Sequence, residues 1–168
     1  REDQPKGQFR RIVIKKEGKV LNLKNIFDIL SIKVLDNFFE QIEDSPTIFS
    51  YSQEEGNRFG FIVKIKDKKD LIITLKSMEP TMESDFERVF SLMGKEGPAA
   101  VNFFKNTENV AGHSSPNFRF KTLNENDLGI CYYISDYYFA FASSWQSMEE
   151  LLVKAEESLI SRVLIEDL

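Results

Sequence analysis

Side chains that could act as a nucleophile or a general base lie at two places in the sequence. The single histidine, His113, precedes Ser114 and Ser115, and the single cysteine, Cys131, lies in an apolar run. A serine nucleophile requires a histidine within hydrogen-bond reach and a third group that orients the imidazole. Adjacent residues rarely achieve this, and the pattern Gly-x-Ser-x-Gly does not occur. A cysteine on a central strand is also poorly placed to react with His113. We therefore predict that neither His113 nor Cys131 is catalytic.

Acidic side chains form three clusters, which suit either a divalent cation or a hydrolase. Glu83 and Glu87 are four residues apart, a spacing that places two carboxylates on one face of a helix. A glycosidase also uses two facing carboxylates. No calcium-loop pattern accompanies them, so we interpret the clusters as solvated helix faces and keep the hydrolase as the alternative. The clusters are Glu40, Glu43 and Asp44; Glu79, Glu83, Asp85 and Glu87; and Glu149, Glu150, Glu156 and Glu157.

An aromatic run in the C-terminal half is the remaining candidate for a binding surface. Proteins that bind single-stranded RNA stack bases on such rings, but the local charge is not basic and the RNP pattern is missing. We expect these rings to pack across neighbouring strands. The sequence 94–97 lacks the spacing of a phosphate-binding loop. The sequence thus predicts no catalytic, metal-binding or cofactor-binding residue. The run comprises Tyr132, Tyr133, Tyr137, Tyr138, Phe139 and Phe141.

The composition is that of one globular domain covering residues 1–168. Hydrophobic residues make up 42% of the chain and charged residues 29%, which excludes disorder. The net charge of −5 argues against a nucleic-acid partner, and the single cysteine excludes an intramolecular disulfide. Residues 1–25 nevertheless hold eight Lys or Arg against three acids, a local balance of +5. We interpret this segment as a solvated edge strand, with an acidic partner or a membrane surface as the alternative.

The spacing of apolar residues predicts a lead-in over residues 1–44 and a core over 45–163. The lead-in contains a strand at 9–14 and helices at 25–30 and 34–43. The core contains two units, and each unit is a hairpin followed by an amphipathic helix. The first unit has strands at 47–52 and 58–66 and a helix that Asp67 caps; the second has strands at 128–134 and 137–142 and a closing helix that reaches about Val163.

Between the two units, Pro80 ends the first helix and a second helix starts at Thr81. A strand at 117–122 is expected to turn Arg119 and Lys121 outward. The alternation over 58–66 indicates a sheet with one wet face. Because an isolated hairpin is marginally stable in water, we expect both units to share one sheet. The predicted fold is α+β, with a mainly antiparallel sheet and its helices packed on one face.

Several segments resemble uncharacterised membrane-anchored proteins of small-genome bacteria. The resemblance spans roughly residues 45–158 and is carried by segments 60–67, 75–82 with Phe90, 128–134 and 139–144. It implies one membrane span upstream of Arg1 and a domain outside the cytoplasm, and it implies no activity or catalytic residue. We therefore expect an extracytoplasmic interaction or spacer domain of a larger protein, with a protein partner and no cofactor. The alternative is a hydrolase or carbohydrate-active domain that uses paired carboxylates.

Overall fold

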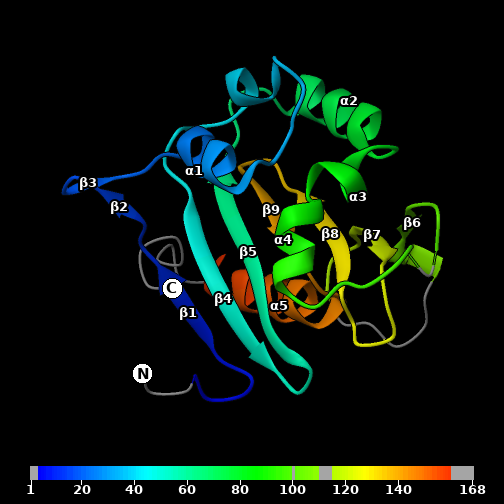
Figure 1. Ribbon diagram of the computed structural model, residues 1–168. Helices are drawn as coiled ribbons and strands as arrows, with labels where there is room; N and C mark the ends of the chain where they lie inside the picture. Colours follow the sequence, from blue (N-terminus) through cyan, green and yellow to red (C-terminus); the bar gives the residue numbers. More distant parts are fainter. Residues whose placement is uncertain (1–3, 100, 110–114, 160–168) are drawn as a thin grey trace.

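The computed structural model describes residues 4–99, 101–109 and 115–159. Its centre is a seven-stranded antiparallel sheet with the strand order β1-β4-β5-β9-β8-β7-β6 (Figure 1). The short strands β2 (Lys15–Lys16) and β3 (Lys19–Val20) form a separate hairpin. The predicted α+β class is confirmed. The strands of the sheet are β1 (Phe9–Ile12), β4 (Thr47–Gln53), β5 (Gly56–Lys64), β6 (Lys105–Asn106), β7 (Arg119–Thr122), β8 (Gly129–Ile134) and β9 (Tyr138–Ala142).

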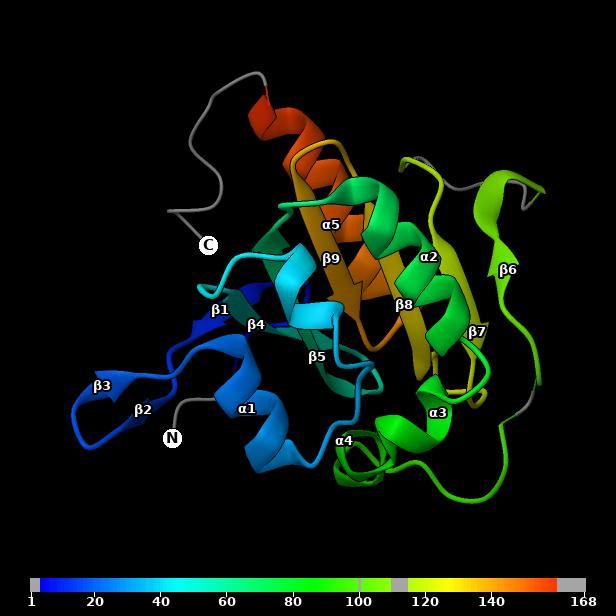
Figure 2. The same ribbon diagram turned by 90° about the horizontal axis from the view of Figure 1, so that it is seen from above.

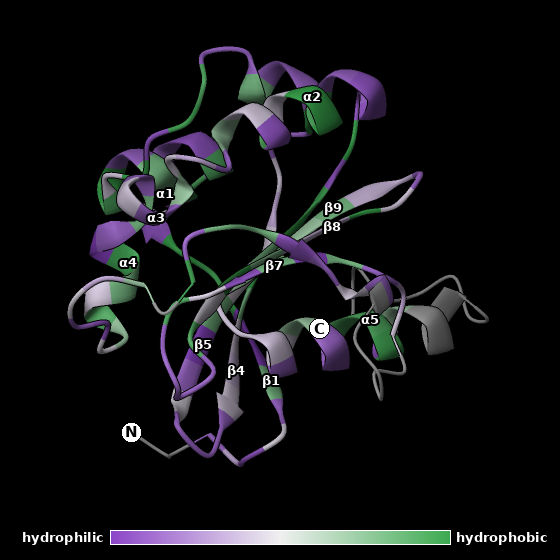
Figure 3. Ribbon diagram, turned by 90° about the vertical axis from the view of Figure 1, so that its right-hand side faces the viewer, coloured by the Kyte–Doolittle hydropathy of each residue, from purple (hydrophilic) through white to green (hydrophobic). Residues whose placement is uncertain are grey.

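Helices cover both faces of this sheet (Figures 2 and 3). One face carries α1 (Leu23–Leu30), the 3-10 helix η1 (Phe38–Gln41), α2 (Lys68–Met78), α3 (Met82–Asp85) and α4 (Glu87–Leu92). The opposite face carries α5 (Trp145–Leu159). The two layers enclose two separate clusters of buried apolar residues. The expectation that all helices pack on one face is therefore wrong for α5.

The two hairpins belong to one sheet, as predicted, because β5 pairs with β9 and places Phe61 opposite Phe141. The phenylalanines of β9 face α1 to α4, whereas Ala140 and Ala142 face α5. Two alanines leave room for a helix to lie close to the strands. The connection from β9 to α5 is residues 143–144, one residue shorter than the connection 65–67 from β5 to α2. Because side chains alternate along a strand, this difference favours opposite faces for the two helices.

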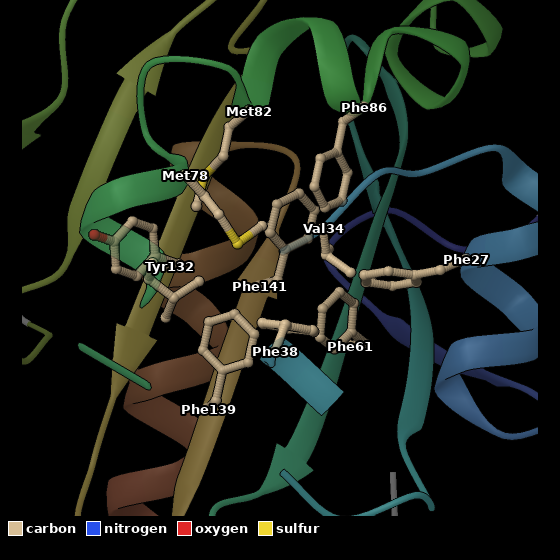
Figure 4. A pocket seen from close by; sticks show the side chains of 11 residues that line it. Phe27, Val34, Phe38, Phe61, Met78, Met82, Phe86, Tyr132, Phe139 and Phe141 are labelled. Carbon is tan, nitrogen blue, oxygen red and sulfur yellow. The ribbon is translucent and has the colours of Figure 1, made fainter. Parts of the chain in front are cut away.

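Phenylalanine rings fill the larger core, as Figure 4 shows. Phe61 of β5 lies with its ring centroid 5.6 Å from that of Phe27, 5.6 Å from that of Phe139 and 5.4 Å from that of Phe141. Phe86, between α3 and α4, stacks on Phe141 at 4.8 Å. The hollow that remains among these rings is only about 10 Å³. Phe61 is 1% exposed and therefore belongs to the interior.

The middle of the other face of β5 is buried, contrary to the sequence-based expectation. Ile62 packs in the cluster beneath α5, and Arg58 is only 3% exposed. Gly60 lies on the same face, where a β-carbon would come within 2.2 Å of the Phe49 ring. Only glycine fits at this position. Arg58 is therefore part of the interior, whereas Lys64 at the end of the strand is exposed.

The predicted helix at 34–43 is also wrong, because only Phe38–Gln41 forms a helical turn. Ile42 instead pairs with Ile65 in a β-bridge. The carbonyl oxygen of Gln41 accepts hydrogen bonds from the N–H groups of Lys66 and Asp67. These contacts with the end of β5 pull the segment out of helical geometry.

The helix starts agree with the sequence signals. The Asp67 carboxylate accepts from the N–H of Asp70 at the start of α2, and Thr81 is the N-cap residue of α3. The hydroxyl oxygen of Ser144 caps α5, since it accepts from the N–H of Ser147. The predicted end of this helix near Val163 lies outside the described residues.

Candidate functional site

The corner between α2 and α3 brings the central acidic cluster against β7 and β8. Pro80 follows Glu79, the C-cap residue of α2, and Glu79 lies beside the sheet there. Its carboxylate accepts two hydrogen bonds from Arg119, from Nε at 2.8 Å and from Nη2 at 2.7 Å. It accepts a third from the Tyr132 hydroxyl at 2.6 Å. The Glu79 carboxylate therefore accepts three hydrogen bonds from side chains of β7 and β8, two of them charge-assisted.

Glu83, on α3, is held in the same way by two lysines. Its carboxylate lies 2.8 Å from Lys121 Nζ and 3.1 Å from Lys95 Nζ. The side chains of the two lysines are only 8% and 11% exposed. Arg119 and Lys121 are two residues apart on β7 and share a face, so they meet Glu79 and Glu83 in register. The expectation that these two basic residues point outward is wrong.

The pKa shifts follow from this arrangement. Burial raises the pKa of the Glu83 carboxyl, whereas the hydrogen bonds and charges of Lys121 and Lys95 lower it. The lowering is the larger effect in sum, so the net shift of the pKa is downward. The hydrogen bond to Glu79 raises the pKa of Arg119. Burial, followed by the hydrogen bond to Glu79, raises the pKa of Tyr132. The Glu83 carboxylate is therefore ionised near neutral pH and ill-suited to donate a proton as a general acid.

Glu87 does not join this cluster. The helix is interrupted at Phe86, so Glu83 and Glu87 belong to separate short helices. Glu87 is exposed, and the ion pairs formed within the described part of the chain do not include it. The two carboxylates that the sequence analysis paired thus have different surroundings. Glu83 forms ion pairs with two lysines, and Glu87 is exposed to solvent.

The remaining candidates from the sequence are scattered. His113 and Ser114 lie outside the described residues, and Ser115 is nearly buried. Cys131 is 1% exposed beneath α5, and burial raises the pKa of its thiol well above the ordinary value. Glu40, Glu43 and Asp44 are exposed beside η1. Among the residues that the structure describes, no group of three or more His, Cys, Asp or Glu is arranged to hold a metal ion.

A partly buried polar network at the start of α5 escaped the sequence analysis. Asp127, at a positive φ of 53°, accepts hydrogen bonds from the N–H groups of Trp145 and Gln146, both at 3.0 Å. Arg58 donates from Nη2 to the carbonyl oxygen of Asn126 at 2.6 Å. Gln53 accepts from the Ser144 hydroxyl at 2.7 Å. A carboxylate at a helix N-terminus accepts hydrogen bonds from the free N–H groups of the helix, and its negative charge interacts favourably with the helix dipole. This network therefore anchors α5 to the sheet.

The surface carries an open groove beside α4. It has a volume of about 420 Å³, and its apolar lining is Ile12 of β1, Phe59 of β5, and Leu92 and Met93 at the end of α4. Leu92 is 76% exposed and Ile12 36%. Glu55 and Arg58 contribute polar lining. No spacing in the sequence indicated that β1 and α4 would line one groove.

A second, smaller hollow lies beside β8, where β7 begins. Its volume is about 210 Å³, and Lys76, Asn117, Arg119 and Tyr133 contribute to its lining. The guanidinium of Arg119 is already committed to Glu79. Among the residues that line this hollow, Lys76 is therefore the cationic side chain available to bind a ligand.

No protein-family model matches the chain, and no curated protein or solved structure matches it. The helices of the described segments are too short or too polar to cross a bilayer. The geometry above is therefore the basis for a functional assignment.

Proposed function

We propose that this chain is a protein-binding domain that acts by surface contact and is not an enzyme. The observation that carries the proposal is the open groove lined by Ile12, Phe59, Leu92 and Met93. Leu92 is large, apolar and 76% exposed at its rim. An exposed apolar surface with polar neighbours is typical of a site that a partner protein covers.

The acidic corner supports the same proposal. A hydrolase with two carboxylates needs one of them to donate a proton and the other to act as nucleophile or base. The Glu83 carboxylate accepts from two ammonium groups, and Glu79 accepts from a guanidinium and a phenol. These contacts give both residues a role in holding the α2–α3 corner to β7. The hydrolase alternative has correspondingly less support.

We extend the proposal to location on the strength of the resemblance to membrane-anchored proteins. The domain would lie outside the cytoplasm as part of a longer, membrane-tethered protein and would present the groove to a partner there. Protease treatment of intact cells tests this placement. Cleavage of this domain without cell lysis supports it, and full protection contradicts it.

Site-specific photo-crosslinking in the source cells tests the binding function. A photoreactive amino acid replaces Leu92 at the groove, and in a matched control it replaces Ile73, which is 56% exposed on α2 away from the groove. We expect a discrete crosslinked protein from position 92 and none from position 73. No adduct at position 92, or the same adduct at both positions, would contradict the proposal.

A further inference from the structure

The free edge of β1 is the surface that the chain leaves most available for backbone pairing. In the described part of the chain, β1 is the terminal strand of the sheet and pairs only with β4. The opposite edge strand, β6, has only two residues. An unpaired edge presents a row of N–H and C=O groups to any extended segment of suitable sequence.

The register identifies which backbone groups point outward. Ser52 donates its N–H to the carbonyl of Gln8, and the register continues with Arg10 opposite Ser50 and Ile12 opposite Ile48. Hydrogen-bonded and non-bonded pairs alternate in an antiparallel ladder. Arg10 and Ile12 therefore bond to β4, and the N–H and C=O groups of Phe9 and Arg11 point to the free edge.

The charge around this edge is strongly positive. Arg10 and Arg11 of β1, together with Lys15, Lys16 and Lys19 of the adjoining hairpin, are exposed. None of the ion pairs formed among the described residues uses these five side chains. Glu17 is the only acid among them, although the chain as a whole has a net charge of −5. A second copy of the same edge would meet like charge, whereas an acidic strand would not.

The edge is continuous with the groove proposed above as the binding surface. Ile12 lines the groove and belongs to β1, and Arg10 lies on the same face of the strand. Phe9 is on the opposite face, beside Lys154 of α5. A strand added to β1 would extend the sheet and carry alternate side chains toward the mouth of the groove.

Resting on the proposed function, we infer that the partner supplies an extended acidic segment that adds to β1 as a further strand. The order apolar, basic, basic, apolar in Phe9–Ile12 selects the complementary order apolar, acidic, acidic, apolar. This order reads the same in both directions, so it serves a parallel or an antiparallel strand. Main-chain hydrogen bonds to Phe9 and Arg11 supply affinity, and the two arginines supply selectivity.

Two capped hexapeptides test this inference with the whole chain. The probe has the sequence Thr-Val-Glu-Glu-Val-Thr, and the control replaces both glutamates by lysine. We expect the acidic peptide to bind at least about tenfold more tightly, because two opposite-charge pairs replace two like-charge pairs. In the variant Arg10→Glu/Arg11→Glu the preference should reverse. Both side chains are exposed, so the variant should keep the unfolding midpoint of the original chain.

Amide hydrogen exchange measured by NMR locates the bound peptide. The exchange rates of the Phe9 and Arg11 amides should fall by about tenfold or more when the acidic peptide saturates the chain, since these amides become hydrogen-bonded. The amides of Arg10 and Ile12, already bonded to β4, should change little. Chemical-shift changes at Phe59 and Leu92 without slower exchange at Phe9 and Arg11 would overturn strand addition and leave the groove as the binding site. Absence of binding, or equal affinity for both peptides, would overturn the inference while the crosslinking experiment still decides the proposed function.

Discussion

Substitution of Glu79 by alanine probes the acidic corner at its most connected residue. The carboxylate of Glu79 accepts two hydrogen bonds from Arg119 and one from Tyr132. The substitution leaves the hydroxyl of Tyr132 without this acceptor, although the residue is only 3% exposed. It also removes the partner of Arg119, whose side chain is 31% exposed and can regain water.

The two losses have different sizes. A buried donor without an acceptor costs about 1–3 kcal/mol. The bidentate pair with Arg119 is partly exposed and screened by solvent, so its loss costs only about 1 kcal/mol. Together they predict that Glu79→Ala lowers the free energy of unfolding by about 2–4 kcal/mol. Adding Tyr132→Phe removes the unsatisfied hydroxyl, so the double variant should be more stable than Glu79→Ala alone.

Urea unfolding measures these differences, and the single tryptophan is a suitable probe. Trp145 packs against Phe118 and Phe120 at ring distances of 4.9 and 4.6 Å, so its fluorescence reports on the fold. Glu87→Ala is the matched control, because Glu87 is close in sequence but is an exposed acid outside the ion-paired corner. We expect the control to change the free energy of unfolding by less than about 0.5 kcal/mol. If Glu79→Ala changed it equally little, the structural role of the corner would be refuted.

Glu83→Gln should destabilise the chain by about 1 kcal/mol at pH 7. The pKa of the Glu83 carboxyl is lower in the fold than in the unfolded chain, so its contribution is present above the unfolded pKa and is lost as pH falls through the folded pKa. Urea unfolding of both proteins at about pH 3 should therefore give a smaller difference, and an unchanged or larger difference would contradict this. Phe61→Ala should cost about 3–5 kcal/mol in a single cooperative transition, because the ring is fully buried. A loss below about 1 kcal/mol in urea unfolding would show that Phe61 is not central to the core. The buried thiol of Cys131 should react with an aromatic disulfide reagent only on unfolding, and fast labelling of the native chain would contradict its placement.

Much of the sheet could be predicted because its signals are local. The alternation in β5 and the short hairpin loops fix strand positions within a few residues of sequence. The cap at Asp67 is a local signal as well. The face of the sheet that α5 covers is a different kind of property. It depends on which side of β9 has room for a helix. The order Phe139-Ala140-Phe141-Ala142 indicates that side, because the alanines are smaller than the phenylalanines, but only when side-chain sizes on the two faces are compared.

The candidate site was predictable only in part, because its contacts join distant segments. Glu79 and Arg119 are 40 residues apart, and Arg58 and Asn126 are 68 apart. No spacing rule relates such pairs. The alternation of the strand alone therefore predicted that Arg119 and Lys121 point outward. The helix expected at 34–43 failed for the same reason. Hydrogen bonds between Gln41 and the end of β5 outweigh the local helical periodicity there.

The most direct test of binding through the groove is the size of the complex that the full-length protein forms in its source cells. Extracts in mild detergent are fractionated by size for the original protein, for Leu92→Glu and for Ile73→Glu. Both substituted side chains are exposed, so both variants should fold. We predict that the original protein and Ile73→Glu elute in one large complex, and that Leu92→Glu elutes as the smaller free protein. Identical elution of all three proteins, or an equal shift for both variants, would contradict binding through the groove.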